Sequence, residues 1–309
     1  MVNKNDDIRL GLLEKIADIH DTPAGAYNIR ENGESSGRQN TDEITIETKT
    51  DKAGINIFVK DGTKQKSVHI PVIITKTGIS EMVYNDFVIG DDCDVLIVAG
   101  CGIHNAGDEK SAHDGVHSLV IGKNSHVRYI EKHYGEGKGT GERVMNPAMT
   151  ARLGKSSVLE IESVQIGGID STNRTTEIIA DENCEVVISE RIMTDGRQKV
   201  ESNTKIVLDG KGSKARINSR SVAKGESVQV FYPRLEGNAE CFGHVQCDSI
   251  IMDSAKVRSI PEIAANSVDA RLIHEAAIGK IAGDQILKLE TLGLTHDEAE
   301  EKILSGLLK

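Results

Sequence analysis

Apolar and polar residues alternate along most of the chain between residues 43 and 266. Ile55, Ile57 and Val59, for example, alternate with polar neighbours before a turn at Asp61-Gly62. A period of two residues places successive side chains on opposite faces of a β-strand. The pattern therefore predicts many short strands separated by turns.

These strands belong to a repeat. Five segments align on a turn residue, and three positions later each carries a small side chain. The small side chains are Cys93, Ser125, Ser157, Cys184 and Ser213. Each repeat of a solenoid buries its apolar edges by stacking on its neighbours, so self-similarity at a spacing of about thirty residues favours a mainly β solenoid. We expect a parallel β-helix over 43–266. A β-sandwich or barrel is the alternative, because its strands also recur regularly.

Helical periodicity appears only at the two ends of the chain. Apolar residues recur at helical spacing over 6–20, and the polar stretch 30–40 resembles an exposed loop, so 1–42 is expected to be an N-terminal helix and linker. Residues 267–309 are expected to contain a last strand and two helices. The first helix starts with Asp284 as its cap, and the second starts at a capping box, Thr295-His-Asp-Glu298.

Composition restricts the possible functions. The 309 residues contain no Trp, only 3% aromatic residues and 30 Gly, which suits stacked short strands better than bulky helix packing. A net charge of −11 argues against nucleic acid and anionic membranes as partners. The sequence shows neither a membrane-spanning run nor a signal peptide, and its five cysteines fit reduced thiols. We expect a cytoplasmic protein.

The strongest candidate for chemistry lies near the C-terminus. Cys247 falls on one predicted strand, and His274-Glu275 follows at the end of the next. Thiolate, imidazole and carboxylate are the main protein ligands of iron, so these three residues predict an iron or sulfur site. Cys241 and His244 give Cys-x2-His-x2-Cys spacing, but an extended strand separates the two thiols by about 20 Å and turns His244 the other way.

A second cluster comprises Cys101, His104, His113 and His117, with His126 and His133 beyond it. Its Cys-x2-His and His-x3-His spacings suit a metal site, whereas polar residues on solenoid corners and rungs are the alternative. Asp114-Gly115 suggests a turn within the cluster, and the segment 131–137 resembles a loop. Cys93 and Cys184 take the small-residue position of the repeat, so we assign them a structural role.

The chain carries no catalytic triad, dinucleotide fingerprint or phosphate-binding loop, so it is not expected to bind or hydrolyse nucleotides. Its C-terminal segments resemble the SufB/SufD family of iron–sulfur cluster assembly proteins. The matching words are Gln-Cys-Asp-Ser-Ile-Ile at 246–251, Ile-Pro-Glu-Ile at 260–263, His-Glu-Ala at 274–276 and Leu-Gly-Leu-Thr-His-Asp-Glu-Ala-Glu at 292–300. The similarity is dense over 240–309 and weaker over about 85–240.

The resemblance implies a right-handed parallel β-helix whose C-terminal helices dock a SufC-like ABC-type ATPase. Family scaffolds pair through the ends of their β-helices. Positions matching Cys247, Glu275 and His274 handle the cluster or its sulfur in SufB-like members. The implied function is a scaffold on which an iron–sulfur cluster is bound transiently, rather than an enzyme, with a sulfur donor and acceptor apoproteins as further partners.

Two features depart from the family pattern. The N-terminal extension of longer SufB proteins is short here, and Ser254-Ala255-Lys256 stands where a second thiol is sometimes found. A homodimer with the ATPase, without a SufD-like partner, is therefore the simplest assembly. The alternatives are a β-helix enzyme acting on polysaccharide, which the few aromatics disfavour, and an interaction subunit of the same complex without its own cluster site. A single chain offers too few ligands, so the site should be completed by a second copy or by the His104–His117 region.

Overall fold

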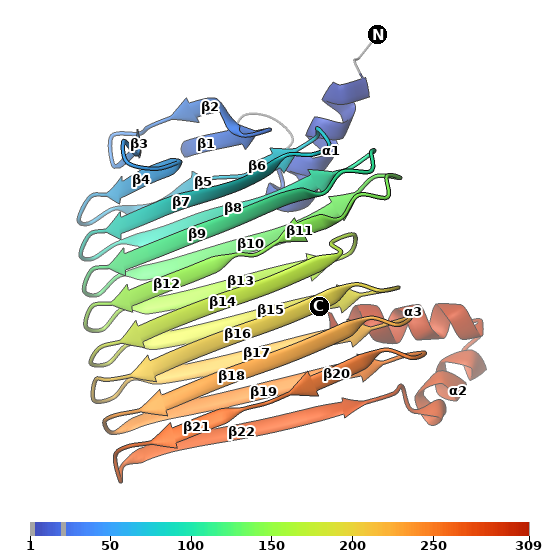
Figure 1. Cartoon of the computed structure of the whole chain (residues 1–309). Coiled ribbons are helices and arrows are strands. Elements are labelled where there is room, and N and C mark those ends of the chain that lie inside the picture. The colour runs from blue at the N-terminus through green and yellow to red at the C-terminus, as the bar shows by residue number, and fades with distance from the viewer. Residues whose placement is uncertain (1–3, 20–22, 309) are drawn as a thin grey trace.

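The computed structural model describes residues 4–19 and 23–308 of the chain. Two sheets of mostly parallel strands face each other, and the chain passes from one sheet to the other along the axis of the solenoid (Figure 1). The predicted parallel β-helix is therefore confirmed, and the alternative of a sandwich or barrel is wrong.

One sheet contains β1 (Ala26–Glu31), β2 (Glu34–Gln39), β5 (Lys64–His69), β6 (Val72–Ile74), β8 (Asp94–His104), β10 (His126–Glu136), β13 (Val158–Ile166), β15 (Glu185–Thr194), β17 (Lys214–Ala223), β19 (Cys241–Ile251) and β22 (Ala270–Gly279). The other contains β3 (Ile44–Thr48), β4 (Gly54–Val59), β7 (Ser80–Ile89), β9 (Ser111–Ile121), β11 (Arg143–Met145), β12 (Ala148–Leu153), β14 (Ser171–Ala180), β16 (Lys199–Leu208), β18 (Val228–Gly237), β20 (Lys256–Ser259) and β21 (Glu262–Ala265). The helices are α1 (Lys4–Ala17), α2 (Gly283–Thr291) and α3 (His296–Leu307).

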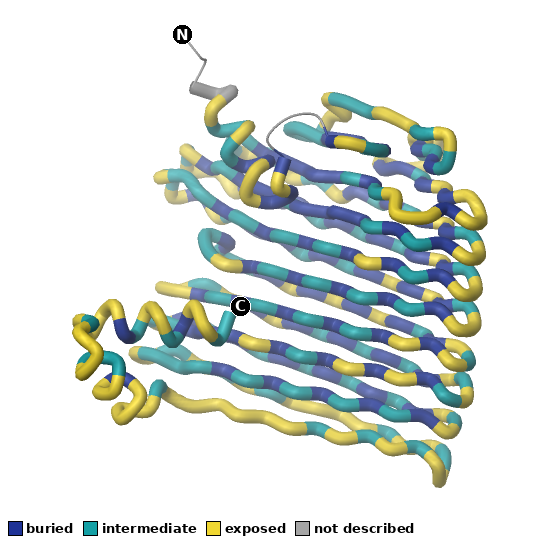
Figure 2. Tube along the Cα trace, turned by 180° about the vertical axis from the view of Figure 1, so that it is seen from behind, coloured by how far each residue is buried: buried dark blue, intermediate teal, exposed yellow. Residues whose placement is uncertain are grey.

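Buried residues alternate with more exposed ones along the strands (Figure 2). The buried apolar side chains of both sheets pack together in the interior. The strands stack in register, so the small-residue positions of the repeat form one column at a corner. The residue before each small one has a positive φ at Asp92, Asn124, Ser156 and Asn183, which makes the corner tight. Cys93 and Cys184 are buried there, as the sequence predicted. Register also places Cys241 next in the column after Ser213.

The N-terminal end of the solenoid is covered. Leu12, Leu13 and Ile16 of α1 pack on the outer face of β8. Gly100 allows this approach, because a Cβ there would lie 2.2 Å from the Ile16 carbonyl oxygen. The sequence expectation of a linker at 30–40 is wrong: β1 and β2 form an antiparallel hairpin, and β1 also pairs with β5 and β6.

Two further loop or turn expectations are wrong for one reason. Residues 131–137 fall mostly within β10, and Asp114-Gly115 lies within β9, because register with the neighbouring coils continues through both segments. Their polar and glycine-rich composition predicts loops, but hydrogen bonding to the strands of the neighbouring coils keeps both segments extended.

The C-terminal end differs from the N-terminal end. The last strand, β22, pairs with β19 and is largely exposed, and α2 and α3 follow beside it (Figures 1 and 2). The capping box of Thr295 and Glu298 is confirmed, whereas Ala282 rather than Asp284 precedes α2 and provides no side-chain cap. No helix in the described ranges has the length and apolar character needed to span a bilayer.

Candidate functional site

Cys247 points into the solenoid from β19, where 2% of its surface is exposed. Register places it in a column of inward-facing residues, each stacked on the equivalent position of the next rung. The column is Ala99, Glu131, Ser163, Glu190, Ser219, Cys247 and Ala276. The predicted thiol is therefore the last polar member of a buried stack and lies one strand from the open end.

The surroundings of Cys247 keep its thiol protonated. Burial raises the pKa of Cys247 to about 11, and the charges of Glu190 and Asp248 add to the rise, while the Ser259 hydroxyl opposes it. A thiol in this environment is inert until a metal ion displaces its proton, because a coordinating thiol is bound as the thiolate.

His274 shares the inner face with Cys247. It pairs in register with buried Val245, two pairs before Cys247 and Ala276, so the Gln246–Glu275 pair lies between them. Its Nε2 atom is buried and has no hydrogen-bond partner among the described residues. Burial lowers the pKa of His274, and the nearby His244 lowers it further, so the imidazole is neutral at neutral pH. An unpartnered neutral imidazole nitrogen on the same face as a thiol is available as a metal ligand.

Glu275 lies on the opposite face of the same strand. Its side chain is 65% exposed, and its Oε2 is 3.5 Å from Nε2 of His244. The alternation of β22 thus separates the predicted trio: Cys247 and His274 lie on the inner face, whereas Glu275 lies outside. The chain alone does not bring all three around one metal ion.

The free edge of β22 lies next to these residues. No strand in the described parts of the chain pairs with that edge, which extends over ten residues. Ile273 and Ile278 on this strand are 39% and 40% exposed. A long, exposed edge strand with apolar side chains is a template for pairing with another chain.

The second predicted cluster lies farther along the interior. Cys101, His113 and His133 point inward from β8, β9 and β10, and the thiol is hydrogen bonded to both imidazoles. Burial raises the pKa of Cys101, but the charges and hydrogen bonds of His113 and His133 overcome it and bring the pKa to about 7. Burial lowers the pKa of His113, whereas Cys101 and Glu81 raise it to about 10. Near neutral pH, Cys101 is therefore about half ionised, and the His113 imidazolium stabilises its thiolate form.

Sequence reasoning missed the buried charges beside Cys101. The Arg174 guanidinium donates to Glu131, lies 3.3 Å from Nδ1 of His133 and is 3.9 Å from a Glu190 oxygen. Ser219 donates to Glu190 at 2.9 Å. A polar network therefore runs along the axis from Cys101 to Ser219, which stacks on Cys247. Burial raises the pKa of Glu131, but Arg174 and His133 hold it well below its ordinary range.

The expected four-ligand metal set does not assemble. His104 faces outward and contacts Glu136 at 3.2 Å, while His117 lies inside and is bound to Tyr129 and Asn85. Within residues 4–19 and 23–308, no group of three or more His, Cys, Asp or Glu side chains is arranged to hold a metal ion. Cys101 and Cys247 are five strands apart, about 24 Å at the spacing of strands in a sheet. The His104–His117 region therefore cannot complete the Cys247 site.

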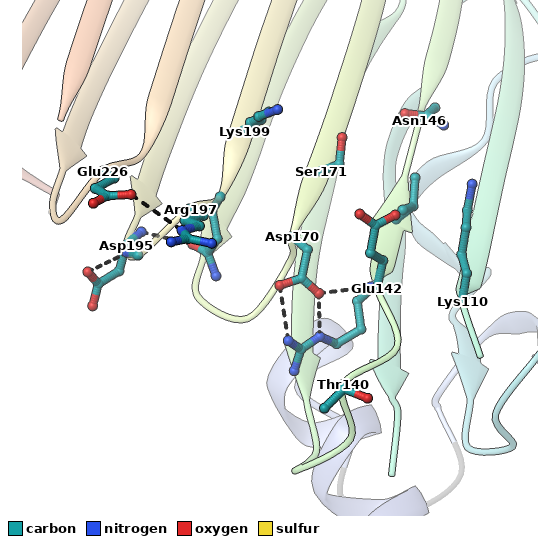
Figure 3. A pocket seen from close by; sticks show the side chains of 14 residues that line it. Lys110, Thr140, Glu142, Asn146, Asp170, Ser171, Asp195, Arg197, Lys199 and Glu226 are labelled. Carbon is teal, nitrogen blue, oxygen red and sulfur yellow. Dashed lines mark hydrogen bonds and ion pairs between the residues drawn. The ribbon is translucent and has the colours of Figure 1, made fainter. Parts of the chain in front are cut away.

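A large surface cavity of about 1020 Å³ contains none of the predicted residues (Figure 3). Charged side chains dominate its wall, and several pair with one another: Arg143 with Asp170, and Arg197 with Glu226. The wall contains no Cys or His, so it offers no soft ligand for iron.

Comparison with known proteins identifies the family. Residues 74–307 match the family model described as the SufBD core domain of the SUF iron–sulfur cluster assembly system. An iron–sulfur cluster assembly SufBD family protein of Methanocaldococcus jannaschii is 29% identical over 87% of this chain and 86% of its own length. One from Archaeoglobus fulgidus is 24% identical over 88% and 73%. For a homologue from Methanothermobacter thermautotrophicus strain Winter the identity is 25% over 77% of this chain and 57% of that protein. With the family model covering most of the solenoid and the C-terminal helices, the chain belongs to the SufBD family of iron–sulfur cluster assembly proteins.

Proposed function

We propose that the protein is a scaffold on which an iron–sulfur cluster is assembled and then released, with no catalytic turnover of its own. The observation that carries this proposal is that the buried thiol of Cys247 and the unpartnered Nε2 of His274 lie on the same inner face of neighbouring strands, next to an open sheet edge. A cluster bound there would be cargo, so a labile set of ligands suits the task better than four thiolates.

Each residue has a distinct role in the proposal. On binding ferrous iron, the Cys247 thiol would lose its proton to solvent, and the thiolate would hold the iron. His274 supplies a neutral nitrogen ligand. Glu275 supplies a hard carboxylate oxygen that releases iron readily, once its strand has rearranged or a second copy presents it to the site.

A second copy of the chain is the proposed way to complete the site. The exposed edge of β22 and its apolar side chains Ile273 and Ile278 favour pairing of two solenoids end to end. In such a homodimer the two Cys247 sites and two Glu275 carboxylates would lie close to the common interface. The ligands that one chain lacks would then come from the partner.

The C-terminal helices are the proposed docking surface for a SufC-like ABC-type ATPase. Leu287 and Leu292 are 60% and 75% exposed, and a cavity of about 840 Å³ separates α2 from the end of the solenoid. Nucleotide-dependent contacts there would shift β22 and its site between two arrangements. A sulfur donor and acceptor apoproteins would be the remaining partners.

Anaerobic reconstitution with ferrous iron and sulfide tests the site. We expect visible absorption from the wild-type protein, and we expect Cys247→Ser and Glu275→Ala each to reduce it severalfold. Cys241→Ser is the matched control, because Cys241 lies on the same strand and face, in a corner column where other coils carry Ser. This control should assemble cluster like the wild type.

Two results would contradict the assignment. Equal cluster content in Cys247→Ser and wild type would show that the thiol is not a ligand. A wild-type protein that takes up no cluster, while still binding the ATPase, would make the chain an interaction subunit without its own site.

Docking is tested with a purified ABC-type ATPase of the same system. Leu287→Asp combined with Leu292→Asp should abolish co-purification of the two proteins, since it places charge on the exposed apolar face. Lys123→Gln, an exposed change on a distant corner, should leave co-purification intact. Retained binding by the double variant would rule out this surface.

A further inference from the structure

The thiol of Cys101 has no place in the proposed cluster chemistry. All five cysteines lie in the described parts of the chain, and Cys101 is the one that is only half-buried. The four cysteines that are closed to solvent are Cys93, Cys184, Cys241 and Cys247. A molecule about the size of water therefore has better access to Cys101 than to the other four.

Cys101 belongs to an arrangement of nucleophile, base and carboxylate. Its thiol is hydrogen bonded to His113, and Nδ1 of His113 lies 3.1 Å from Oε1 of Glu81. Arg30 donates to the other oxygen of this carboxylate at 2.7 Å. Because Glu81 accepts from Nδ1, the Nε2 proton of His113 is left to face the thiol. A thiol beside an imidazole that a carboxylate orients is the geometry of an activated cysteine nucleophile.

A second imidazole holds the thiol from the neighbouring strand. His133 pairs in register with Cys101 and is hydrogen bonded to its thiol. Arg174 lies 3.3 Å from Nδ1 of His133 and donates to Glu131, so a buried ion pair fixes this ring in turn. The effect of burial, which raises the pKa of Cys101, is outweighed by the two imidazoles, which bring it to about 7. The site thus presents a thiolate, the nucleophilic form of sulfur, between two fixed rings.

None of the other four cysteines is within reach of Cys101 for a disulfide. Cys93 precedes the same strand and lies eight residues earlier in the sequence, which is about 26 Å in an extended chain. Cys184 and Cys241 lie in the same corner column as Cys93. Cys247 is five strands away. An oxidised Cys101 therefore meets no thiol of its own chain with which to form a disulfide.

We propose that Cys101 is a site of oxidation by hydrogen peroxide, at which the folded protein forms a stable and reversible sulfenic acid. The thiolate sulfur attacks one peroxide oxygen, so that an S–O bond forms as the O–O bond breaks. Sulfur loses two electrons to the peroxide, and the departing hydroxide takes the Nε2 proton of His113 and leaves as water. A small thiol condenses with the sulfenic acid with loss of water, and a second small thiol exchanges with the mixed disulfide and restores Cys101.

The site favours hydrogen peroxide over larger or charged electrophiles. Hydrogen peroxide is small and uncharged, so its entry into the interior costs less desolvation than the entry of an ion. Its leaving group needs a proton at the moment of bond cleavage, and His113 holds that proton next to the sulfur. An interior packed at native density has no room for a bulky reagent.

Trapping of sulfenic acid tests the proposal in the full chain without iron, so the test does not depend on the cluster function. The reduced protein would be treated at pH 7 with hydrogen peroxide and dimedone, and mass spectrometry would follow the adduct at each cysteine. We expect labelling of Cys101 at least about tenfold faster than that of Cys247, because only Cys101 is substantially ionised at this pH. Cumene hydroperoxide, which is too bulky for the interior, should label Cys101 far more slowly.

Variants place the reaction in this arrangement. His113→Gln should slow the labelling of Cys101 at pH 7 by at least about fivefold, because the thiolate fraction falls as the pKa of the thiol rises. Glu81→Gln keeps the imidazole but removes the charge that orients it, so it should slow labelling in the same direction. His104→Gln is the matched control, because His104 lies on the outer face of the same strand and contacts Glu136. Circular dichroism and the thermal midpoint would show that each variant is folded.

Three outcomes would overturn the proposal. The first is a dimedone adduct that forms no faster at Cys101 than at Cys247. The second is equal labelling by hydrogen peroxide and cumene hydroperoxide, which would mean that oxidation takes place in an opened chain. The third is an unchanged rate in both His113→Gln and Glu81→Gln. Cluster uptake is measured separately, so failure of this proposal leaves the scaffold function untouched.

Discussion

The interior of one solenoid holds two thiols in opposite states. Cys101 lies between two imidazoles near the covered end, and its pKa is brought down to about 7. Cys247 lies among small residues near the open end, and burial raises its pKa to about 11. The same fold therefore allows one thiol to ionise near neutral pH, whereas the other stays protonated unless a metal ion binds it. Neighbouring charge, rather than depth of burial, decides the difference.

Thiol ionisation is the largest expected contrast between the two regions. At pH 7 about half of Cys101 but only about one Cys247 in ten thousand should be thiolate. The alkylation rate of each cysteine, followed by mass spectrometry against pH, should rise with a midpoint near pH 7 for Cys101 and continue to rise beyond pH 10 for Cys247. Coincident profiles would refute the contrast.

Removing one imidazole sharpens the same comparison. His113→Gln should raise the pH midpoint of Cys101 alkylation by at least about one unit, because His113 contacts this thiol. The alkylation profile of Cys247, which does not contact His113, should stay unchanged. Labelling after denaturation provides the control, since all cysteines should then react alike.

The buried charges beside Cys101 give the next largest effect. Arg174→Met should lower the free energy of unfolding by about 3–5 kcal/mol, because it leaves Glu131 and Glu190 without their guanidinium partner in the interior. Arg191→Met is the matched control. Arg191 pairs with Glu162 on the outer surface, where loss of a pair costs about 0–1 kcal/mol. Equal denaturant midpoints for the two variants would contradict a buried network.

A smaller effect concerns the stability of the folded protein at acidic pH. The folded-state pKa of His117 is lowered to about 4 from an ordinary 6.5, so as pH falls below 6.5 the unfolded chain takes up a proton that the folded chain refuses. His117 should therefore cost about 3 kcal/mol of stability between pH 6.5 and 4. His117→Gln should flatten the pH dependence of the unfolding free energy in that window. An unchanged slope would show that His117 is protonated in the folded protein.

The sequence allowed the architecture to be predicted more fully than the site. The small-residue positions at Cys93, Ser125 and Ser157 form a corner column because tight corners repeat on every coil, and that repetition is visible in one chain. The capping box before α3 is equally local. Cys247 and His274 could be placed on adjacent strands by their alternation alone.

The acid–base network could not be predicted from local pattern. Arg174 and Glu131 are 43 residues apart, on different sheets, and polar residues in alternating strands are normally assigned to the outer face. The repeat alignment did contain the information: extended along the column of Cys247, it places Glu131, Glu190 and Ser219 on the same inward line. Ligand chemistry and the family resemblance put Glu275 in one predicted site with Cys247, although its parity puts it on the outer face.

Native mass spectrometry of the anaerobically reconstituted protein tests the central claim most directly, because a site short of ligands in one chain must be shared. We predict a dimer that carries its cluster at the interface and loses it in Cys247→Ser but not in Cys101→Ser. A monomer with a complete cluster, or a Cys247→Ser dimer with undiminished cluster, would contradict the account.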